Sequence, residues 1–321
     1  MTTYTIRRIL LIIPTIFIVS LIVFASVRLM PGDIVDLLIA DAGASGDVRE
    51  SIERTLGLDV PAHVQYFRWM KGIFTEGDLG KSLVTFGSVN PIIFPRIAVT
   101  FELGLIALII SLLVGVPIGI YSAIQQDTLG DYLGRGFAIG AVSIPHFWLG
   151  AMVMLYPAIY WGWAPPVVYI PFTQDPLGNI GMLLIPAAII AMTIAGQVMR
   201  MTRTMMLEVL RQDYIRTAWS KGLKERVVIM RHALKNALIP VVTLIGLAVP
   251  WLISGSLVIE QIFVIPGLGR LMLSALNDRD YTTVSALNLV VAVAVVLVNV
   301  IVDLTYSWLD PRVQLMKEGK R

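Results

Sequence analysis

The stretch Ile97–Ile124 has the sequence IAVTFELGLIALIISLLVGVPIGIYSAI, and its only charged residue is Glu102, near the start. A helix needs about 20 mostly apolar residues to cross the hydrocarbon core of a bilayer. Helices are suited to this task because they pair their backbone N–H and C=O groups internally, where no water is available. The stretch therefore predicts a transmembrane helix.

Five further stretches of this kind occur along the chain: Ile9–Leu29, Phe137–Trp161, Ile180–Met199, Ala237–Val258 and Val284–Trp308. Charged residues make up 15% of the 321 residues, whereas soluble domains have about 25%, and the mean hydropathy is +0.78. We therefore predict an all-α integral membrane protein with six transmembrane helices. The first apolar run is longer than the roughly 7–15-residue core of a signal peptide, so we expect it to be retained.

Lysine and arginine in the connecting segments predict the orientation, because positively charged loops stay in the cytoplasm. The connection between the fourth and fifth stretches, residues 200–235, contains nine basic and three acidic residues. Basic residues also precede the first stretch and occur in the tail: Arg7, Arg8, Arg312, Lys317, Lys320 and Arg321. With six spans, all of these lie on one side. We therefore expect a multi-pass protein of the bacterial cell (inner) membrane with both termini in the cytoplasm.

The polar segments divide the chain into parts. Residues 1–30 form the N-terminal tail and first helix, and residues 31–96 form an outer, periplasmic or extracellular, insertion with nine acidic and six basic residues. Residues 97–310 form a five-helix core that includes the cytoplasmic connection 200–235, and residues 311–321 form a cytoplasmic tail. The insertion is interpreted either as a cap on the outer rim or as a docking surface or gate for an external binding protein.

The sequence lacks the residue patterns of common metal and catalytic sites. No cysteine is present, which excludes disulfides, thiolate metal ligands and cysteine nucleophiles. His63, His146 and His232 lie far apart, without the spacing of metal ligands. We therefore expect no metal, no cofactor held by this chain and no enzymatic activity of its own. The basic residues gather on one membrane face, so nucleic acid is not expected as a partner.

The tripeptide Gly80-Lys81-Ser82 is similar to the end of a phosphate-binding P-loop. That motif needs a glycine five residues earlier, where this chain has Thr75, and no strand is predicted before it. Nucleotide binding is therefore not predicted for this chain.

A short amphipathic helix is predicted inside the connection 200–235. It covers Tyr214–Trp219 and is stopped by Gly222. Its apolar face, formed by Tyr214, Ile215, Ala218 and Trp219, is not explained by the rule that places positive charge inside. A short amphipathic helix outside the membrane can fill a groove on a partner protein.

At this helix the sequence resembles a known family. The segment Asp213–Leu223, DYIRTAWSKGL, resembles the EAA loop of ABC importer permeases. Its continuation Arg231–Pro240, RHALKNALIP, resembles the form of that loop in the dipeptide and oligopeptide (nickel) permease family. The general Glu-Ala-Ala is replaced here by Arg216, Thr217 and Ala218.

Further motifs similar to this family occur in order along nearly the whole chain. Among them are PGD at 31–33, LGLD at 56–59, GDLG at 77–80, TFEL at 100–103, SIP at 143–145, PGLG at 266–269, RDY at 279–281 and LDPR at 309–312. The pattern resembles the first of the two permease subunits of such systems. It implies the type I ABC importer permease fold.

The resemblance also implies partners. These are a second permease subunit, two cytoplasmic ABC ATPases that bind ATP and Mg²⁺, and an extracytoplasmic substrate-binding protein. The residues implied to couple this chain to the ATPases are Asp213, Tyr214, Arg216, Thr217, Ala218, Lys221 and Gly222. The implied cargo is a dipeptide or oligopeptide. Relatives with the same pattern move nickel chelates, glutathione, opines or oligosaccharides, so these cargoes stay open as alternatives.

Residues that could line or gate a path are harder to select. The candidates are His146, beside a proline, Trp251 and Ser254 in the fifth span, and Glu260 near its outer end. A stand-alone secondary transporter or channel would need a charged relay or ion site near the midplane, often with inverted repeats. The spans are nearly free of such groups, so the coupled importer is the preferred hypothesis.

Overall fold

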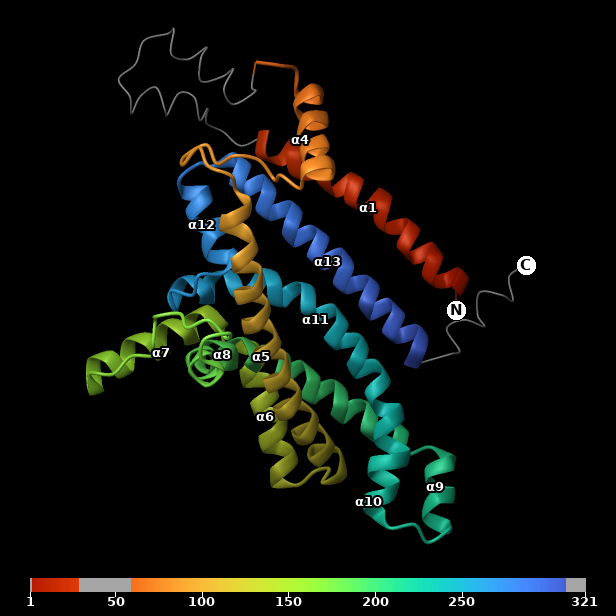
Figure 1. Cartoon of the computed structure of the whole chain (residues 1–321). Coiled ribbons are helices and arrows are strands. Elements are labelled where there is room, and N and C mark those ends of the chain that lie inside the picture. The colour runs from red at the N-terminus through yellow and green to blue at the C-terminus, as the bar shows by residue number, and fades with distance from the viewer. Residues whose placement is uncertain (1, 29–58, 310–321) are drawn as a thin grey trace. The chain divides into compact units, whose positions relative to one another are not determined.

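The computed structural model describes residues 2–28 and 59–309 (Figure 1). The first part of the predicted outer insertion and the C-terminal tail lie outside these residues. By its contacts the chain forms two compact units. The larger unit comprises Thr100–Pro266 and the chain from Val298 on, and the smaller unit comprises Thr2–Val99 and Gly267–Leu297.

The described chain is helical, apart from an isolated β-bridge between Lys81 and Ser88. The helices are α1 (Thr2–Arg28), α4 (Ala62–Glu76), α5 (Asn90–Ile124), α6 (Leu129–Ser143), α7 (His146–Trp161), α8 (Pro176–Leu210), α9 (Asp213–Ser220), α10 (Glu225–Val227), the π-helix η1 (Val228–Ala233), α11 (Leu234–Ile262), α12 (Leu268–Asn277) and α13 (Tyr281–Leu309).

Within the described residues, four helical segments are long and apolar enough to cross a membrane: Asn90–Ile124, Pro176–Leu210, Glu225–Pro250 and Tyr281–Val302. The bent pair α6 and α7 gives a fifth span if its two helices count as one. In α1 the apolar part Leu10–Ser26 is shorter. The predicted count of six spans therefore stays a prediction.

The stretch Phe137–Trp161 is not the single straight helix that its apolar run suggested. The chain bends by 92° between α6 and α7. Pro145 precedes α7, and Ile144 before it has extended backbone angles (φ −83°, ψ 121°). A proline ring disfavours the α conformation in the preceding residue, so the helix ends at Ser143.

Glycines let the helices of the larger unit approach closely. A Cβ atom on Gly115 would lie 2.7 Å from the backbone oxygen of Ala195, and one on Gly119 would lie 2.7 Å from Cβ of Thr202. This pair therefore packs α5 against α8, as small-residue pairs do in membrane helices. A Cβ atom on Gly136 or Gly140 of α6 would meet no group from another described part of the chain within 4 Å.

The smaller unit is held by a buried carboxylate. Asp280 is 5% exposed and accepts hydrogen bonds from Ser82 Oγ at 2.6 Å and from the backbone N–H of Leu83 at 3.1 Å. It also accepts from Thr283 Oγ1 at 2.6 Å, in the first turn of α13. Ser82, which ends the P-loop-like tripeptide, thus serves to fasten the segment before α5 to α13.

Candidate functional site

The connection from α8 to α11 contains the predicted short helix, now α9. Asp213 begins it, where a carboxylate is favourable next to the free N–H groups of the first turn. At the other end the N–H of Gly222 donates to the carbonyl of Trp219 at 2.9 Å. Gly222 has φ +74°, a left-handed conformation that glycine adopts without steric cost. The predicted helix and its glycine stop are confirmed.

The apolar side of α9 is buried against the chain itself. Ile215 is fully buried and Ala218 is 7% exposed. They belong to one cluster with Ala123 of α5, Met206 of α8, and Val228, Ile229 and Ala233 of η1. The expectation that all four apolar residues form one outward face is therefore wrong for Ile215 and Ala218. The amphipathic pattern was real, but its apolar side packs inward.

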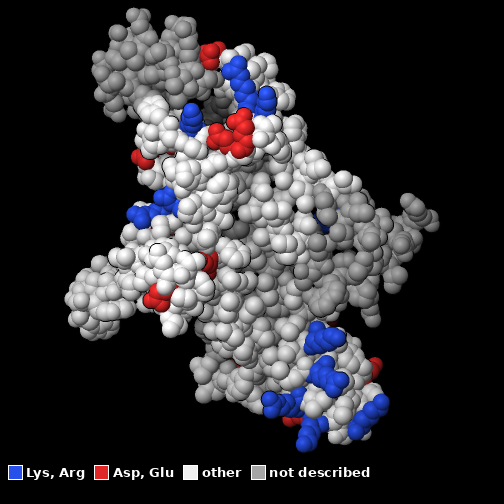
Figure 2. Space-filling view, in the orientation of Figure 1, with Lys and Arg blue, Asp and Glu red and all other residues white. Residues whose placement is uncertain are grey.

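The outer side of α9 presents polar and aromatic groups. Tyr214 is 44% and Trp219 is 43% exposed, and Arg216, Thr217 and Ser220 are exposed between them. The hydroxyl of Tyr214 accepts a hydrogen bond from Asn236 Nδ2 at 2.9 Å. Figure 2 shows lysines and arginines gathered around α9 and α10. The exposed basic residues of this region are Arg211, Arg216, Lys221, Lys224, Arg226, Arg231 and Lys235.

A π-helix connects this region to α11. The segment η1 packs against α8 and α9 and continues directly into α11. A π-helix is rare, and short ones are frequent at functional sites. The π-helix η1 is fixed to the hydrophobic cluster that contains Ile215 and Ala218 by three buried side chains, those of Val228, Ile229 and Ala233.

A buried ion pair fastens α6 to α8 in the same unit. Arg203 donates from Nε to Oδ1 of Asp131 and from Nη2 to Oδ2, both at 2.8 Å. The Asp131 side chain is fully buried and that of Arg203 is 17% exposed. Ser122 Oγ and the backbone N–H of Asp127 also donate to the carboxylate. Such a bidentate, charge-assisted pair is strong and geometrically specific.

Comparison with known proteins places the chain in a family. The family model described as "Binding-protein-dependent transport system inner membrane component" matches residues 115–315, and its N-terminal companion model matches residues 1–103. The chain belongs to this family.

Similar proteins align with this inner membrane component over almost its whole sequence. It is 41% identical over 314 residues to a candidate peptide transport system permease protein of Brucella abortus, covering 98% of this chain and 99% of that protein. It is 37% identical over 340 residues to the dipeptide transport system permease protein DppB of Escherichia coli K12, covering 99% and 100%.

Solved structures agree on the fold. The MetNI methionine ABC transporter, in inward-facing conformations, matches with a TM-score of 0.53 at 14% identity, covering 68% of this chain and 96% of that chain. An amino acid ABC transporter with histidines matches with a TM-score of 0.52 at 12% identity, covering 70% and 94%. The transmembrane fold of this inner membrane component is therefore that of ABC transporter membrane subunits.

The proposed path residues of the inner membrane component occupy different environments. Glu260 is fully buried, and its Oε1 accepts hydrogen bonds from Thr100 Oγ1 at 2.8 Å and Ser256 Oγ at 3.0 Å. His146 is half-buried at the start of α7. The side chains of Trp251 and Ser254 lie outside the described part of the structure. The assignment of these four residues to a path stays a prediction.

A second polar group lies between α5, α8 and the segment before α8. Glu102 Oε2 accepts hydrogen bonds from the hydroxyl of Tyr169 at 2.8 Å and from Asn179 Nδ2 at 3.2 Å. Burial, together with the hydrogen bond to Glu102 and the negative charge there, raises the pKa of Tyr169 to about 12. Tyr169 is therefore held in its neutral, donating form.

Sequence reasoning missed Asp131, Ser122 and Tyr169. Asp131 follows Thr128, whose hydroxyl accepts from the Asp131 backbone N–H as the N-cap of α6. That local signal predicts a helix start but not a partner. From the sequence, Arg203 was counted only among the basic residues that predict the orientation in the membrane.

Proposed function

We propose that this chain is the first permease subunit of an ATP-driven importer of dipeptides and oligopeptides, coupled to cytoplasmic ATPases through α9. The observation that supports it best is the two-sided construction of α9. Its inner side is anchored by Ile215 and Ala218, and its outer side presents Tyr214, Arg216 and Thr217 among basic residues. The names of the full-length relatives support the peptide cargo.

In this proposal the outer side of α9 docks into a cleft on an ATPase subunit. A pull on α9 is passed to the membrane helices because Ile215 is fully buried among side chains of α8 and η1. Separating α9 from them would expose an isoleucine, which costs about 1.5–3 kcal/mol. The helix therefore moves together with α8 and η1 rather than alone.

The complete transporter in this proposal contains other chains. A second permease subunit completes the translocation path, two ATPases bind ATP and Mg²⁺, and an extracytoplasmic protein delivers the cargo. The protein lies in the bacterial inner membrane, with six spans, α9 and both termini in the cytoplasm, and residues 31–96 outside. The charge distribution supports this orientation. ATP hydrolysis belongs to the partner ATPases.

Co-purification from the native membrane tests the coupling. The exposed Thr217 on α9 is changed to Asp, because a change at the buried Ala218 would also disturb packing. The control is Thr173→Asp, at an exposed threonine in the segment before α8. We expect Thr217→Asp to retain the second permease and lose the ATPases, and the control to retain both. ATPases that stay bound to the Thr217→Asp protein, with peptide uptake unchanged, would refute the coupling role.

The cargo is tested separately, by uptake of labelled dipeptides and tripeptides into cells with and without this chain. Peptide uptake that is lost on deletion and restored by the intact gene supports the proposal. If peptide uptake is unchanged while uptake of a nickel chelate, glutathione or an oligosaccharide is lost, the peptide assignment is wrong.

A further inference from the structure

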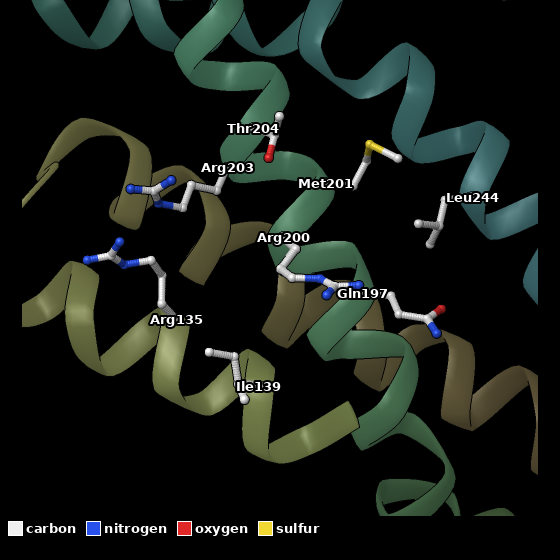
Figure 3. Close-up of a pocket in the computed structure, with 8 residues that line it drawn as sticks. All are labelled: Arg135, Ile139, Gln197, Arg200, Met201, Arg203, Thr204 and Leu244. Atoms are coloured by element: carbon white, nitrogen blue, oxygen red, sulfur yellow. The ribbon is translucent and has the colours of Figure 1, made fainter. Parts of the chain in front are cut away.

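A pocket of about 510 Å³ opens between α6, α8 and α11 of the larger unit (Figure 3). Its lining combines three arginines with two polar and three apolar residues: Arg135, Arg200, Arg203, Gln197, Thr204, Ile139, Met201 and Leu244. The coupling proposal uses none of them.

The charge around this pocket is not balanced. Asp131 accepts hydrogen bonds from Nε and Nη2 of Arg203, both at 2.8 Å. Figure 3 shows the side chains of Arg135 and Arg203 extending toward one another from α6 and α8. Nε of Arg135 is 3.7 Å from Oδ1 of Asp131, and it is buried without a hydrogen-bond partner among the residues that the structure describes. With Arg200, three arginines and one carboxylate leave a formal charge of +2.

The position of the pocket along α8 is that of a membrane boundary. Between Asp175 and Arg200 the sequence contains no charged residue. These 24 uncharged residues rise about 36 Å as a helix, slightly more than the roughly 30 Å of a hydrocarbon core. Arg200 and Arg203 therefore lie at the level where lipid headgroups begin, on the side of the membrane where α8 leads into α9.

Part of the wall of the pocket is apolar. Ile139 of α6 is 63% exposed, and Met201 of α8 and Leu244 of α11 line the pocket on the other side of Arg200 (Figure 3). A soluble anion would gain nothing from this surface. A molecule with an anionic end and hydrocarbon chains would satisfy both the arginines and the apolar wall.

We propose that this pocket binds the phosphate group of an acidic phospholipid from the leaflet on the α9 side. Guanidinium groups match phosphate oxygens in geometry and charge, and basic pockets between transmembrane helices are suited to lipid phosphates. Arg200 from α8 holds the phosphate, the neighbouring Arg135 from α6 adds positive charge, and the acyl chains follow Ile139 and Leu244. The bound lipid thereby adds a second link between α6 and α8, next to the Asp131–Arg203 pair.

The test uses the full-length chain in the complex in which it purifies, stripped of lipid in detergent. Binding of dioctanoyl phosphatidylglycerol, dioctanoyl phosphatidylcholine and inorganic phosphate is measured by calorimetric titration. The variants are Arg200→Gln alone and Arg135→Gln with Arg200→Gln. Arg203 is kept because it holds Asp131. The matched control is Arg68→Gln with Lys71→Gln, at two exposed basic residues of α4 outside the pocket and away from α9 in the sequence.

We expect saturable binding of phosphatidylglycerol, with phosphatidylcholine and inorganic phosphate at least about tenfold weaker. Arg200→Gln weakens phosphatidylglycerol binding about tenfold or more, the size typical of one lost charge-assisted hydrogen bond, and the double variant weakens it further. The control leaves the affinity unchanged. Because Arg200 is exposed, its single variant keeps the test valid if the double variant does not fold.

Several results would overturn the proposal. Equal binding of phosphatidylcholine would mean that the acyl chains alone are recognised. Inorganic phosphate that binds as tightly as the lipid would make this a site for a soluble anion. Unchanged affinity in Arg200→Gln and the double variant would place the lipid elsewhere. Displacement of phosphatidylglycerol by a dipeptide would assign the pocket to a cargo carboxylate. None of these outcomes depends on whether α9 binds an ATPase.

Discussion

Asp131→Asn is expected to loosen the contact between α6 and α8. The carboxylate is fully buried, and it balances the charge of Arg203 through two hydrogen bonds of 2.8 Å. The neutral amide would leave Arg203, only 17% exposed, without a counter-charge. Breaking one side of a buried pair costs about 3–5 kcal/mol. We expect a loss of about 3 kcal/mol, at the lower end, because Arg203 keeps some contact with water and Asn still accepts one hydrogen bond.

The absence of cysteine from the chain provides an assay. Ala141→Cys places one thiol at a buried position of α6 that faces α8, because a Cβ atom on Gly196 would lie 3.2 Å from Cβ of Ala141. The rate at which a thiol reagent modifies it in mild detergent reports how often the helices open. A loss of about 3 kcal/mol predicts a rate more than about 100-fold faster, since each 1.4 kcal/mol is about tenfold. Asp175→Asn, at the exposed N-cap of α8, serves as control, because Asn caps a helix as well as Asp.

The double variant of Asp131→Asn with Arg203→Gln completes the test. Removing both partners leaves no buried charge unpaired, so its cost is expected to be smaller than the sum of the two single costs by more than about 1 kcal/mol. Additive costs, or an Asp131→Asn rate within about threefold of the parent, would show that the pair does not hold these helices together.

Three further predictions follow from packing and ionisation. In thermal unfolding, Gly115→Ala is expected to destabilise the protein by about 1–3 kcal/mol, because its Cβ would lie 2.7 Å from a backbone oxygen. Gly136→Ala, with open space around it, is expected to be neutral or slightly stabilising in the same measurement. Tyr169 is expected to ionise near pH 12. Its ionisation is measured by ultraviolet difference absorbance, with the Tyr169→Phe protein as reference. Glu102→Gln is expected to lower the pKa of Tyr169. Because the folded pKa is the higher one, the stabilisation from Tyr169 is present below about pH 10 and is lost as the pH rises to about 12. Ile215→Ala is expected to lower the stability of the packing around α9 by about 2–5 kcal/mol. The segment between α8 and α11 should then be cleaved faster by a protease, and resistance equal to that of the parent protein would contradict the burial of Ile215.

Much of the fold follows from hydropathy. A long apolar run such as Ile97–Ile124 has no stable alternative to a membrane helix, and it lies within α5. The run Phe137–Trp161 shows the limit of this reasoning, because the bend before α7 depends on the local effect of Pro145 rather than on hydropathy. The proline was visible in the sequence. Membrane helices tolerate proline often enough that the residue alone does not decide between a kink and a break.

Helix α9 was predictable in position but not in the direction that its apolar side faces. Amphipathic spacing in α9 defines an apolar side, and nothing in that spacing states whether this side packs on the chain itself or on another protein. Ile215 and Ala218 are buried only because Met206 and Val228, from two other helices, lie beside them. The Asp131–Arg203 pair has the same character, since its partners are 72 residues apart. Contacts over such separations depend on the packed fold and leave no local signal.

The contacts of the larger unit define which helices can move together. Ile215 and Ala218 fix α9 to α8 and η1, η1 continues into α11, and the Asp131–Arg203 pair adds α6. Separating any two of these elements exposes a buried isoleucine or an unpaired charge, at a cost of about 1.5–5 kcal/mol. Helix α7 is fixed to the same group, because it packs against α8 and α11, and a Cβ atom on Gly150 would lie 3.1 Å from Cδ1 of Ile259. A force applied to α9 is therefore expected to displace α6, α7, α8, η1 and α11 as one body.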